Sequence, residues 1–514
     1  MYREVQIRIS PEAALSQEEI KKAVSRQSGI SNERIVRFNV VKRSVDARRK
    51  PVLINLCVGV HVDEIEEKEA AFLPSYRDVS SKEKVIIVGA GPAGLFAALR
   101  LIERGFCPVV FERGKTVDER KTDLKKMYVS GIVDPDSNFG FGEGGAGTFS
   151  DGKLFSRSKK RGNTQRILEI LVYHGADKSI LVDAHPHIGT DKLGNVIINI
   201  RKTIERYGGV VHFGHRVTDL LVKDGRVEGV IAGDKEFLSR NVVLATGHSA
   251  RDIYNLLHNK GITLEQKEFA VGLRLEHLQH DIDCIQYHSR QGRGDYLPAA
   301  EYNFVANVDG RGVYTFCMCP GGVVVPAATA PEQQVVNGMS SSTRNSIWAN
   351  SAIVTTIGSP ELEKLNLHGI FGGMKFQEML EKSAYSCSGG NLFAPAQAVV
   401  DFLKGKTSQR LPITSYKPGV VETNFSEWLP DFLYNRLKTG IRMFDFKAKG
   451  FVNENAILLG VETRTSSPVR IPRSAVTRMN TQLKGLFPCG EGAGYAGGIM
   501  SAAMDGESCA EIIF

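Results

Sequence analysis

Residues 84–113 read KVIIVGAGPAGLFAALRLIERGFCPVVFER, and this stretch predicts a strand, a glycine turn, a helix and a second strand. The β-branched run 85–88 is typical of a parallel strand that is buried on both faces. Gly89, Gly91 and Gly94 then form the pattern G-x-G-x-x-G. Gly89 permits the tight turn, Gly91 lets a diphosphate approach the backbone, and Gly94 lets helix and strand pack closely. Gly105 is placed to end the helix.

The second strand ends at Glu112, whose carboxylate can accept hydrogen bonds from both ribose hydroxyls of an adenosine. This acid stands at the spacing of about twenty residues that the motif requires, and the helix N-terminus offers N–H groups and a positive dipole end to a diphosphate. The full context favours dinucleotide binding over a purely structural glycine turn. Because Glu112 would repel a 2′-phosphate, we expect NAD or FAD.

The bulk composition indicates a soluble globular protein of more than one domain. The chain has 514 residues, of which 24% are charged, and a net charge of +8. No apolar run approaches the roughly 18 residues that span a bilayer, and the N-terminus lacks the apolar segment of a signal peptide. The eight cysteines include no C-x-x-C pair, which favours a reducing compartment. We therefore expect a cytoplasmic protein without membrane contact.

Residues 1–78 predict a small N-terminal α/β module with a ferredoxin-like βαββ order on one antiparallel sheet. Ser16 is the expected N-cap of its helix, with Glu19 as capping-box partner, and residues 63–80 predict a linker. A basic patch between the last two strands either contacts nucleic acid or forms a solvated hairpin tip. No stacking aromatic residues interleave its charges, so we favour the solvated tip and expect no nucleic-acid partner. The patch consists of Lys42, Arg43, Arg48, Arg49 and Lys50.

A second glycine-dense stretch, residues 138–153, reads NFGFGEGGAGTFSDGK. So many glycines cost conformational entropy and are expected where backbone runs close to a flat or phosphorylated ligand, although a long lid is the alternative. Arg113 and Arg120 are candidates to neutralise diphosphate charge. Further on we expect helices at 163–174 and 194–207, a hairpin of 210–222 and 227–231 that turns at Asp224-Gly225, and a strand at 241–247 that ends in Ala-Thr-Gly and rejoins the nucleotide-binding sheet.

In residues 263–445 the sequence pattern differs from the preceding part, with several short strand-like runs and helical segments near 373–383 and 395–404. This pattern predicts an inserted substrate or cap domain. Cys317 and Cys319 stand there in the sequence FCMCPGG. A C-x-C pair can cycle as a strained disulfide or attack a substrate, but we favour packing as small apolar side chains. No second cysteine pair has finger-like spacing, so we expect no metal site.

The C-terminal stretch predicts a second half of the cofactor site. Residues 485–494, GLFPCGEGAG, predict a strand followed by a glycine turn. Glu491 at the strand end can bind hydroxyls of a sugar-alcohol chain. Gly498 precedes a helix over 499–512, whose positive end would stabilise an anionic reduced flavin.

Together these stretches resemble the glutathione-reductase-type flavoproteins, and more narrowly the bacterial group of FAD-dependent, or NAD(FAD)-utilising, dehydrogenases. The matching stretches are 139–154, 269–277, 316–322, 460–470 and 486–506. In that family the first motif holds the ADP half of FAD and a Gly-Asp motif holds the ribityl chain, and here Gly490-Glu491 stands in its place. The resemblance implies FAD as cofactor, bound by Gly89, Gly91, Pro92, Ala93, Gly94, Glu112, Arg113, Arg120, Glu143, Gly144, Gly145, Thr148, Val217, Ala245, Thr246, Gly247, Gly490, Glu491, Gly498 and Ile499.

The predicted fold class is α/β, with a Rossmann-type FAD-binding domain, an inserted α+β cap domain and the small N-terminal module. The predicted boundaries are 1–78 for the N-terminal module, 79–262 and 446–514 for the two parts of the FAD-binding domain, and 263–445 for the cap.

We expect an FAD-dependent oxidoreductase, a dehydrogenase or reductase that moves a hydride between flavin N5 and an organic small molecule. Only one strand–turn–helix unit carries the dinucleotide motif, so NAD(P)H, as a donor, would bind transiently at the flavin face. The alternatives are an oxidase that uses O₂, an RNA-associated flavoprotein that docks through the basic patch, and a regulatory flavin-binding protein. The sequence defines neither the substrate nor the oligomeric state.

The catalytic candidates come from the matched motifs. Arg464 can clamp a carboxylate in bidentate fashion, or it can form an internal ion pair with Glu462 or Glu276. The candidates are Arg274, His277, Cys317, Cys319 and Arg464, with Glu276, Glu462 and Thr463 beside them.

Overall fold

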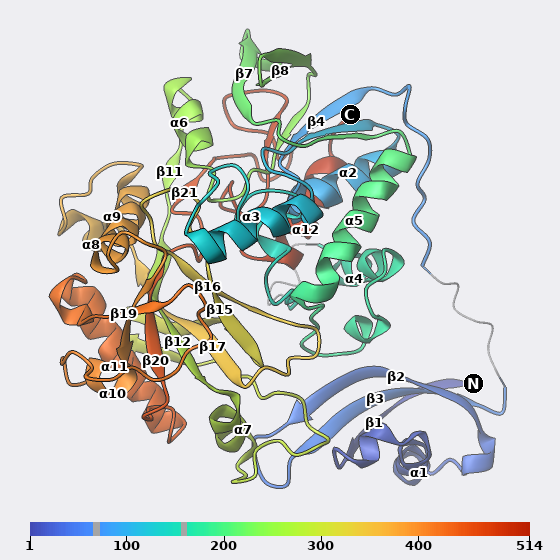
Figure 1. Cartoon of the computed structure of the whole chain (residues 1–514). Helices are drawn as coiled ribbons and strands as arrows, with labels where there is room; N and C mark the ends of the chain where they lie inside the picture. The colour runs from blue at the N-terminus through green and yellow to red at the C-terminus, as the bar shows by residue number, and fades with distance from the viewer. Residues whose placement is uncertain (65–71, 156–161) are drawn as a thin grey trace.

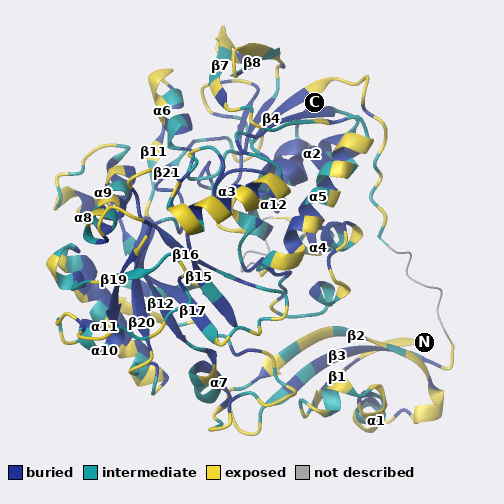
Figure 2. Ribbon diagram, in the orientation of Figure 1, coloured by how far each residue is buried: buried dark blue, intermediate teal, exposed yellow. Residues whose placement is uncertain are grey.

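The computed structural model describes residues 1–64, 72–155 and 162–514. Figure 1 shows three units. The N-terminal module, in blue, lies at the lower right, the nucleotide-binding domain lies above it, and the cap, mostly yellow to orange, lies at the lower left. The dark interior of the sheets in Figure 2 shows that the buried residues gather along the strands of each unit.

The N-terminal module is a three-stranded antiparallel sheet covered by one helix. Its strands stand in the order β1-β3-β2. The Ser16 hydroxyl accepts a hydrogen bond from the Glu19 N–H at 3.3 Å, as predicted. The βαββ order is confirmed, but the described residues hold fewer elements than a full ferredoxin-like unit. Of the predicted linker, 65–71 lie outside the described residues. The elements are β1 (Tyr2–Ile9), η1 (Ala13–Leu15), α1 (Gln17–Ser28), η2 (Asn32–Arg34), β2 (Ile35–Asp46) and β3 (Leu53–Val62).

A five-stranded, wholly parallel sheet forms the nucleotide-binding domain, in the order β22-β10-β4-β5-β6. Its helices α2 and α12 pack on each other and share the largest apolar core with α4 and α5. Gly105 ends α2 in the left-handed region, at φ 86°, as predicted. The elements are β4 (Lys84–Val88), α2 (Pro92–Arg104), β5 (Cys107–Phe111), α3 (Val117–Ser130), η3 (Gly145–Gly147), α4 (Thr164–Tyr173), η5 (Lys178–Leu181), α5 (Thr190–Arg206), β6 (Val210–His212), β10 (Val242–Leu244), β22 (Leu486–Pro488) and α12 (Ile499–Glu511).

A small antiparallel sheet, β7-β8-β9, is attached to this domain together with α6. The predicted hairpin forms and turns at Asp224 and Gly225, which both have positive φ. The expected strand 210–222 is wrong in one respect, because 210–212 join the parallel sheet and only the part from Val217 onward enters the hairpin. The elements are β7 (Val217–Lys223), β8 (Arg226–Ala232), β9 (Lys235–Leu238) and α6 (Arg251–Asn259).

The cap is built on a seven-stranded sheet in the order β13-β14-β17-β12-β20-β18-β19. Strand β20 belongs to this sheet, so the chain returns to the nucleotide-binding domain after Glu462 and not at residue 446. The helix expected at 395–404 begins as a strand, because β18 is paired on both sides. The sheet strands are β12 (Phe269–Leu278), β13 (Val305–Val308), β14 (Arg311–Cys319), β17 (Trp348–Ile357), β18 (Ala394–Ala398), β19 (Val420–Glu422) and β20 (Ile457–Glu462).

Shorter strands and helices surround this sheet. The hairpin of β15 and β16 is a separate two-stranded sheet, as is the pair of β11 and β21. These elements are β11 (Glu265–Gln266), α7 (Gln279–Tyr287), β15 (Gly322–Pro326), β16 (Val336–Ser340), α8 (Ser359–Glu363), α9 (Gly372–Cys387), α10 (Val399–Phe402), η6 (Phe425–Glu427), α11 (Asp431–Lys447) and β21 (Val469–Arg470).

The two faces of the cap sheet differ in chemistry. Along β12, Leu273, Leu275 and His277 point to one face, and the two leucines belong to the apolar core that α11 covers. Arg274 and Glu276 alternate with them and therefore point to the other face. The second face is also buried, but it carries these charged side chains beside apolar ones such as Ile457 and Leu459, and the β15–β16 hairpin packs against it.

The basic patch of the N-terminal module is partly used in docking this module. The backbone of Arg43 exchanges hydrogen bonds with Val182 and Ala184, and its side chain pairs with Asp183 at 2.7 Å. Arg48 pairs with Asp46 at 2.7 Å. These contacts support a structural use of the patch. In the described part of the chain, every helix is too short or too polar to span a membrane.

Candidate functional site

Three glycine turns meet at the carboxyl edge of the parallel sheet, which is where ligands bind in open α/β sheets. A Cβ atom at Gly89 would overlap the Ala245 carbonyl oxygen, and one at Gly94 would overlap the Gly89 carbonyl oxygen. A Cβ at Gly492 would meet the Gly247 backbone. The turns after β4, β10 and β22 therefore need glycine in order to pack against one another.

Gly91 is different, because no atom of the described residues requires a glycine at this position. Its φ is −77°, which any residue adopts, and the nearest atom to an added Cβ is Gly145 Cα at 3.9 Å. Pro92 follows as the first residue of α2, so the helix N-terminus lies open beside this space. The free space at Gly91, the predicted diphosphate position, fits a cofactor whose phosphates contact the backbone.

Glu112, the candidate ribose ligand, also binds the backbone of the surrounding glycine turns. Its carboxylate accepts hydrogen bonds from the N–H groups of Ala90, Gly114 and Gly142, each at 2.9 Å, and the residue is 5% exposed. A carboxylate has about four acceptor positions. Glu112 therefore keeps capacity for one ribose hydroxyl, where two had been expected. The N–H of His215 donates to the Glu112 carbonyl, so the segment that leads to Val217 runs beside this residue.

The two arginines expected at the diphosphate have other partners. Arg120 is fully buried and donates to the carbonyl oxygens of Asn138, Phe139, Glu143 and Gly145, and burial lowers its pKa to about 10. Arg113 pairs with Asp136 and Asp252 and lies over the Phe141 ring. Both side chains shape the second glycine stretch, so the α2 N-terminus is left to bind the phosphates.

The second glycine stretch supplies backbone more than side chains. Glu143 is buried, accepts from the Val117 N–H and pairs with Arg201, so it fixes α3 and α5. Thr148 donates to the Glu143 carbonyl oxygen, and Gly144 leaves room for that hydroxyl. Gly145 backs directly on Gly91, with 3.2 Å between its ideal Cβ position and Gly91 Cα. Of the predicted members of this stretch, the structure brings Gly144 and Gly145 to the first motif, because the Gly144 N–H also donates to the Ala90 carbonyl oxygen at 2.8 Å.

At the C-terminal turn, the Glu491 carboxylate lies 3.2 Å from Nδ1 of His248 and is 24% exposed. Gly498 precedes α12 and is exposed, and Ile499 lies against Gly147 of the second glycine stretch. The half-exposed Thr246 and the buried Ala245 follow β10 between these turns. The C-terminal turn thus contacts the turn after β10 and the second glycine stretch.

A buried cluster supports the C-terminal turn from behind. Cys489, Asp505 and Cys509 bring three potential metal ligands within 4.8 Å of one another. The Arg473 guanidinium fills this cluster, because it pairs with both Asp505 oxygens and reaches Cys509 Sγ at 3.4 Å. Asp505 also accepts from the Gly490 N–H at 2.8 Å. We therefore read the cluster as a support for Gly490 and not as a metal centre.

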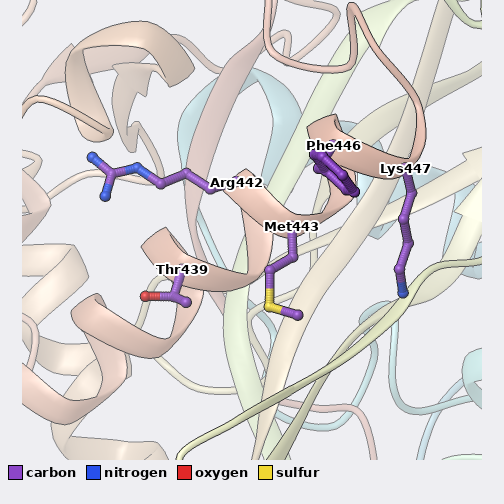
Figure 3. A pocket seen from close by; sticks show the side chains of 5 residues that line it. All are labelled: Thr439, Arg442, Met443, Phe446 and Lys447. Atoms are coloured by element: carbon purple, nitrogen blue, oxygen red, sulfur yellow. The ribbon is translucent and has the colours of Figure 1, made fainter.

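One pocket joins the C-terminal glycine turn to the polar face of the cap sheet. The strand β14 contributes aromatic side chains and the segment after β20 contributes hydroxyls. The pocket is lined by Lys267, Tyr314, Phe316, Thr465, Ser466, Arg470, Gly494, Tyr495, Ala496 and Gly497. A second recess, seen in Figure 3, is a shallow surface formed by side chains of α11 alone, Thr439, Arg442, Met443, Phe446 and Lys447.

Arg274 is the centre of the polar cap face. It is 0% exposed, and its five N–H groups all have protein partners. Nε donates to Asn350 Oδ1 at 2.9 Å, Nη1 to Glu462 Oε2 at 3.0 Å and to Asn337 Oδ1 at 3.2 Å. Nη2 donates to the Cys317 carbonyl oxygen at 2.9 Å and approaches Cys319 Sγ at 3.7 Å. With no N–H group left for a ligand, Arg274 is a positioning residue.

Cys317 sits in a strained bulge of β14 that this arginine holds. The register with β17 shifts between Phe316 and Cys319, and Cys317 has φ 45°, in the left-handed region. Its side chain is exposed, yet burial raises the pKa of its thiol to about 12. Cys319 is buried beneath Arg274, and burial raises the pKa of its thiol as well.

The remaining candidates have structural partners. His277 packs on Phe451 on the apolar side of the sheet, donates from Nε2 to the Phe451 carbonyl oxygen at 2.7 Å, and has its pKa lowered to about 4 by burial. Glu276 is buried, and its carboxylate accepts hydrogen bonds from the Thr414 hydroxyl and the Ser415 N–H. Strand alternation thus puts His277 on the face opposite Arg274 and Glu276, where it contacts Phe451.

Arg464 forms an internal ion pair, but with a carboxylate that the sequence did not indicate. Glu381 of α9 is fully buried. Its carboxylate accepts hydrogen bonds from Nε and Nη2 of Arg464, from Nη2 of Arg251 and from the Thr463 hydroxyl. Burial works to raise the pKa of Glu381, but the Arg464 and Arg251 guanidiniums outweigh it and hold that pKa below its usual value. This cluster joins the cap to the loop after β10.

Sequence reasoning missed Glu381, Asn350 and His248. The first two have no local signal, because they meet their partners from distant elements. His248 had one, since it directly follows the Ala-Thr-Gly strand end that the sequence assigns to the cofactor site.

Comparisons with known proteins agree with this architecture. Residues 83–279 match the family described as pyridine nucleotide-disulphide oxidoreductase, and residues 268–465 match the family described as FAD-dependent protein, C-terminal domain-like. Residues 1–61 match a domain of unknown function (DUF8436). An uncharacterized protein of Clostridium beijerinckii is 41% identical, and the match covers 96% of this chain and 95% of the relative.

The solved structures that resemble the chain do so distantly. The crystal structure of CtdE in complex with FAD is 12% identical, covers 84% of each chain and has a TM-score of 0.30. An oxidoreductase from Methanosarcina mazei is also 12% identical, covers 83% of this chain and 100% of its own, and has a TM-score of 0.34. At such TM-scores the likeness carries no argument about function.

Proposed function

Because the chain belongs to the FAD-dependent oxidoreductase family, with FAD as its cofactor, we propose that it oxidises or reduces an organic small molecule bound between the cap sheet and the N-terminus of α12. FAD supplies hydride chemistry at N5 when bound. The observation that carries the proposal is the pocket in which Tyr314 and Phe316 of β14 face Gly494 and Gly497 of the C-terminal turn. Both the cofactor side and the cap side contribute to it.

The pocket's lining suits an organic molecule with at least one polar group. The three aromatic rings of Tyr314, Phe316 and Tyr495 offer flat apolar surface, and Thr465 and Ser466 add hydroxyl groups that can form hydrogen bonds. Such a composition, apolar with a few polar groups, is typical of small-molecule sites. It supports an organic substrate over a purely regulatory flavin.

Cys317 is the candidate from the matched motifs that presents a reactive atom to solvent. Cys317 directly follows Phe316, which lines the pocket, and its raised pKa keeps the thiol protonated at neutral pH. We therefore propose that it lies beside the substrate as a weak hydrogen-bond donor and not as a thiolate nucleophile. Arg274 positions it by holding its carbonyl oxygen. The same pKa argues against the reading of Cys317 and Cys319 as a cycling disulfide.

NAD(P)H is the proposed transient electron donor. The chain carries one strand–turn–helix dinucleotide unit, and FAD uses it. A nicotinamide donor would therefore enter the same pocket as the substrate, in alternation with it.

Anaerobic stopped-flow absorbance of the FAD-loaded protein tests the proposal. NADH, NADPH and a panel of amines, hydroxy acids and thiols would be mixed in turn, and we expect loss of the oxidised flavin band on a millisecond-to-second scale with one of them. A flavin that dithionite reduces but no organic donor reduces would overturn the proposal. Prompt reoxidation by air would instead favour the oxidase alternative.

A matched pair of variants locates the site. Phe316→Ala removes an aromatic wall of the pocket, so we expect the donor concentration for half-maximal reduction to rise about tenfold. Phe446→Ala removes the same side chain from the α11 surface of Figure 3, where the ring is 92% exposed, and should change nothing. Equal effects of the two changes would place the substrate elsewhere.

A further inference from the structure

Glu491 stands where related flavoproteins usually have aspartate, and the structure shows what the longer side chain does. Its Oε1 lies 3.2 Å from Nδ1 of His248. The two residues follow the neighbouring parallel strands β22 and β10, three residues after Pro488 and four after Leu244. An aspartate would be shorter by one C–C bond, about 1.5 Å, and would not reach the imidazole. Glu491 and His248 therefore form a unit across the two cofactor turns.

The other imidazole nitrogen has no protein partner. The His248 side chain is 10% exposed, and its Nε2 is buried without a hydrogen-bond partner among the described residues. A buried polar atom left unpaired costs free energy, and in native structures such an atom is normally satisfied. Since His248 directly follows Gly247, whose open side has no atom within 4 Å of an added Cβ, its surroundings include free space at the cofactor edge.

We propose that His248 is a further FAD-binding residue, in which Nδ1 holds Glu491 and Nε2 bonds the polar chain between the two ring systems of FAD. With Nδ1–H donating to Glu491, a neutral imidazole presents Nε2 as an acceptor for a ribityl hydroxyl, and a protonated one presents a donor for a phosphate oxygen. The inference rests on FAD binding and is independent of the substrate proposed above, so either can fail alone.

The test is FAD rebinding to the whole chain after the cofactor has been removed, followed by flavin fluorescence. His248→Asn places an amide near the Nδ1 position and keeps the bond to Glu491, but it has no atom at the Nε2 position. We expect its FAD dissociation constant to rise about tenfold, the value of one hydrogen bond to a buried polar atom. His248→Gln, which reaches toward the Nε2 position, should recover part of that loss. His368→Asn, at an exposed loop position of the cap, is the matched control and should bind as the wild type does.

ADP as a second ligand distinguishes the two possible contacts on FAD. If Nε2 bonds the diphosphate, His248→Asn weakens ADP and FAD alike, and if it bonds the ribityl chain, ADP binding is unchanged and only FAD is weakened. Either pattern supports the proposal. Thermal unfolding of the cofactor-free variant controls for a general structural role and should match the wild type. An unchanged FAD dissociation constant in His248→Asn, with the protein folded, would overturn the inference.

Discussion

The carboxyl edge of the parallel sheet and the inner face of the cap sheet meet at one pocket, but they are built from different groups. The edge consists of backbone turns whose glycines either touch one another, as Gly94 and Gly89 do, or leave space, as Gly91 does. The cap face carries buried charged side chains among apolar ones, and every N–H group of its central arginine, Arg274, has a protein partner. Turns that leave space can receive a cofactor, whereas a fully bonded arginine can only hold other residues in place.

Two glycine substitutions, three residues apart, test most directly whether the sheet edge contains both packing glycines and a glycine that leaves space for a cofactor. Gly94→Ala places a Cβ into the Gly89 carbonyl oxygen, so we expect more than about 3 kcal/mol of destabilisation and little folded protein. Gly91→Ala adds the same atom where the nearest neighbour is 3.9 Å away. We expect that variant to fold normally and to bind FAD about 100-fold more weakly, about 2.7 kcal/mol.

Thermal unfolding without FAD and FAD titration measure the two effects separately. If Gly91→Ala lost as much stability as Gly94→Ala, Gly91 would be a packing glycine and the open space beside it would have no role.

In the cap, a large loss of stability is expected from substitution of Glu381, because this residue forms salt bridges with both Arg464 and Arg251. Glu381→Gln leaves two buried guanidiniums without their carboxylate, so we expect a loss of about 3–5 kcal/mol. Glu378→Gln on the same helix is the control. It is 40% exposed and lies 3.9 Å from Arg251, so its loss should stay under about 1 kcal/mol.

The pH dependence of this effect has a definite sign. The pKa of Glu381 is lowered in the folded protein, so its contribution is present above its ordinary pKa of 4.5 and is lost as pH falls below that value. Urea unfolding at several pH values should therefore show the largest difference between wild type and Glu381→Gln near neutral pH, shrinking in acid. A difference that grew in acid would contradict the ion-pair account.

The same contrast explains which features the sequence could predict. The edge was predictable because its signals are local: the spacing of Gly89, Gly91 and Gly94, and an acid after the next strand, lie within thirty residues. The cap face was not, because Arg274 meets Asn350 and Glu462 from β17 and β20, and no spacing in one strand indicates partners in another. Arg120 was misjudged for a related reason, since its partners are backbone carbonyl oxygens, which the sequence does not distinguish.

A smaller effect is expected from Arg274→Lys, which keeps the charge but lacks the planar fork that joins five partners. We expect a loss of about 2 kcal/mol from the broken hydrogen bonds, with FAD affinity unchanged because Arg274 lies on the cap side. Thermal unfolding and FAD titration are the measurements. A fall in FAD affinity equal to that of Gly91→Ala would mean that the cap face also holds the cofactor and that the division between the two regions is false.

The smallest change in stability is expected for a substitution at Cys317. This position tests which chemical group the cap offers to a substrate. Because the side chain is exposed, Cys317→Ser should alter stability by less than about 0.5 kcal/mol. The informative measurement is alkylation of the wild type by a small thiol reagent, followed by peptide mass spectrometry. Since burial raises the pKa of the thiol to about 12, its thiolate fraction, and thus its labelling rate, should rise about tenfold per pH unit across the range from 7 to 10.

Cys319 is the internal control for that experiment, because it is buried beneath Arg274 and should stay unlabelled in the folded protein. A Cys317 rate that levels off near pH 8.5, as that of an ordinary thiol does, would mean that the surroundings of the sulfur are polar enough to support a thiolate. The C-x-C pair would then regain its redox interpretation, and the cap would contribute chemistry of its own. A rate that keeps rising, and that falls when a bound organic substrate covers the pocket, would leave Cys317 as a protonated thiol that Arg274 holds against the substrate.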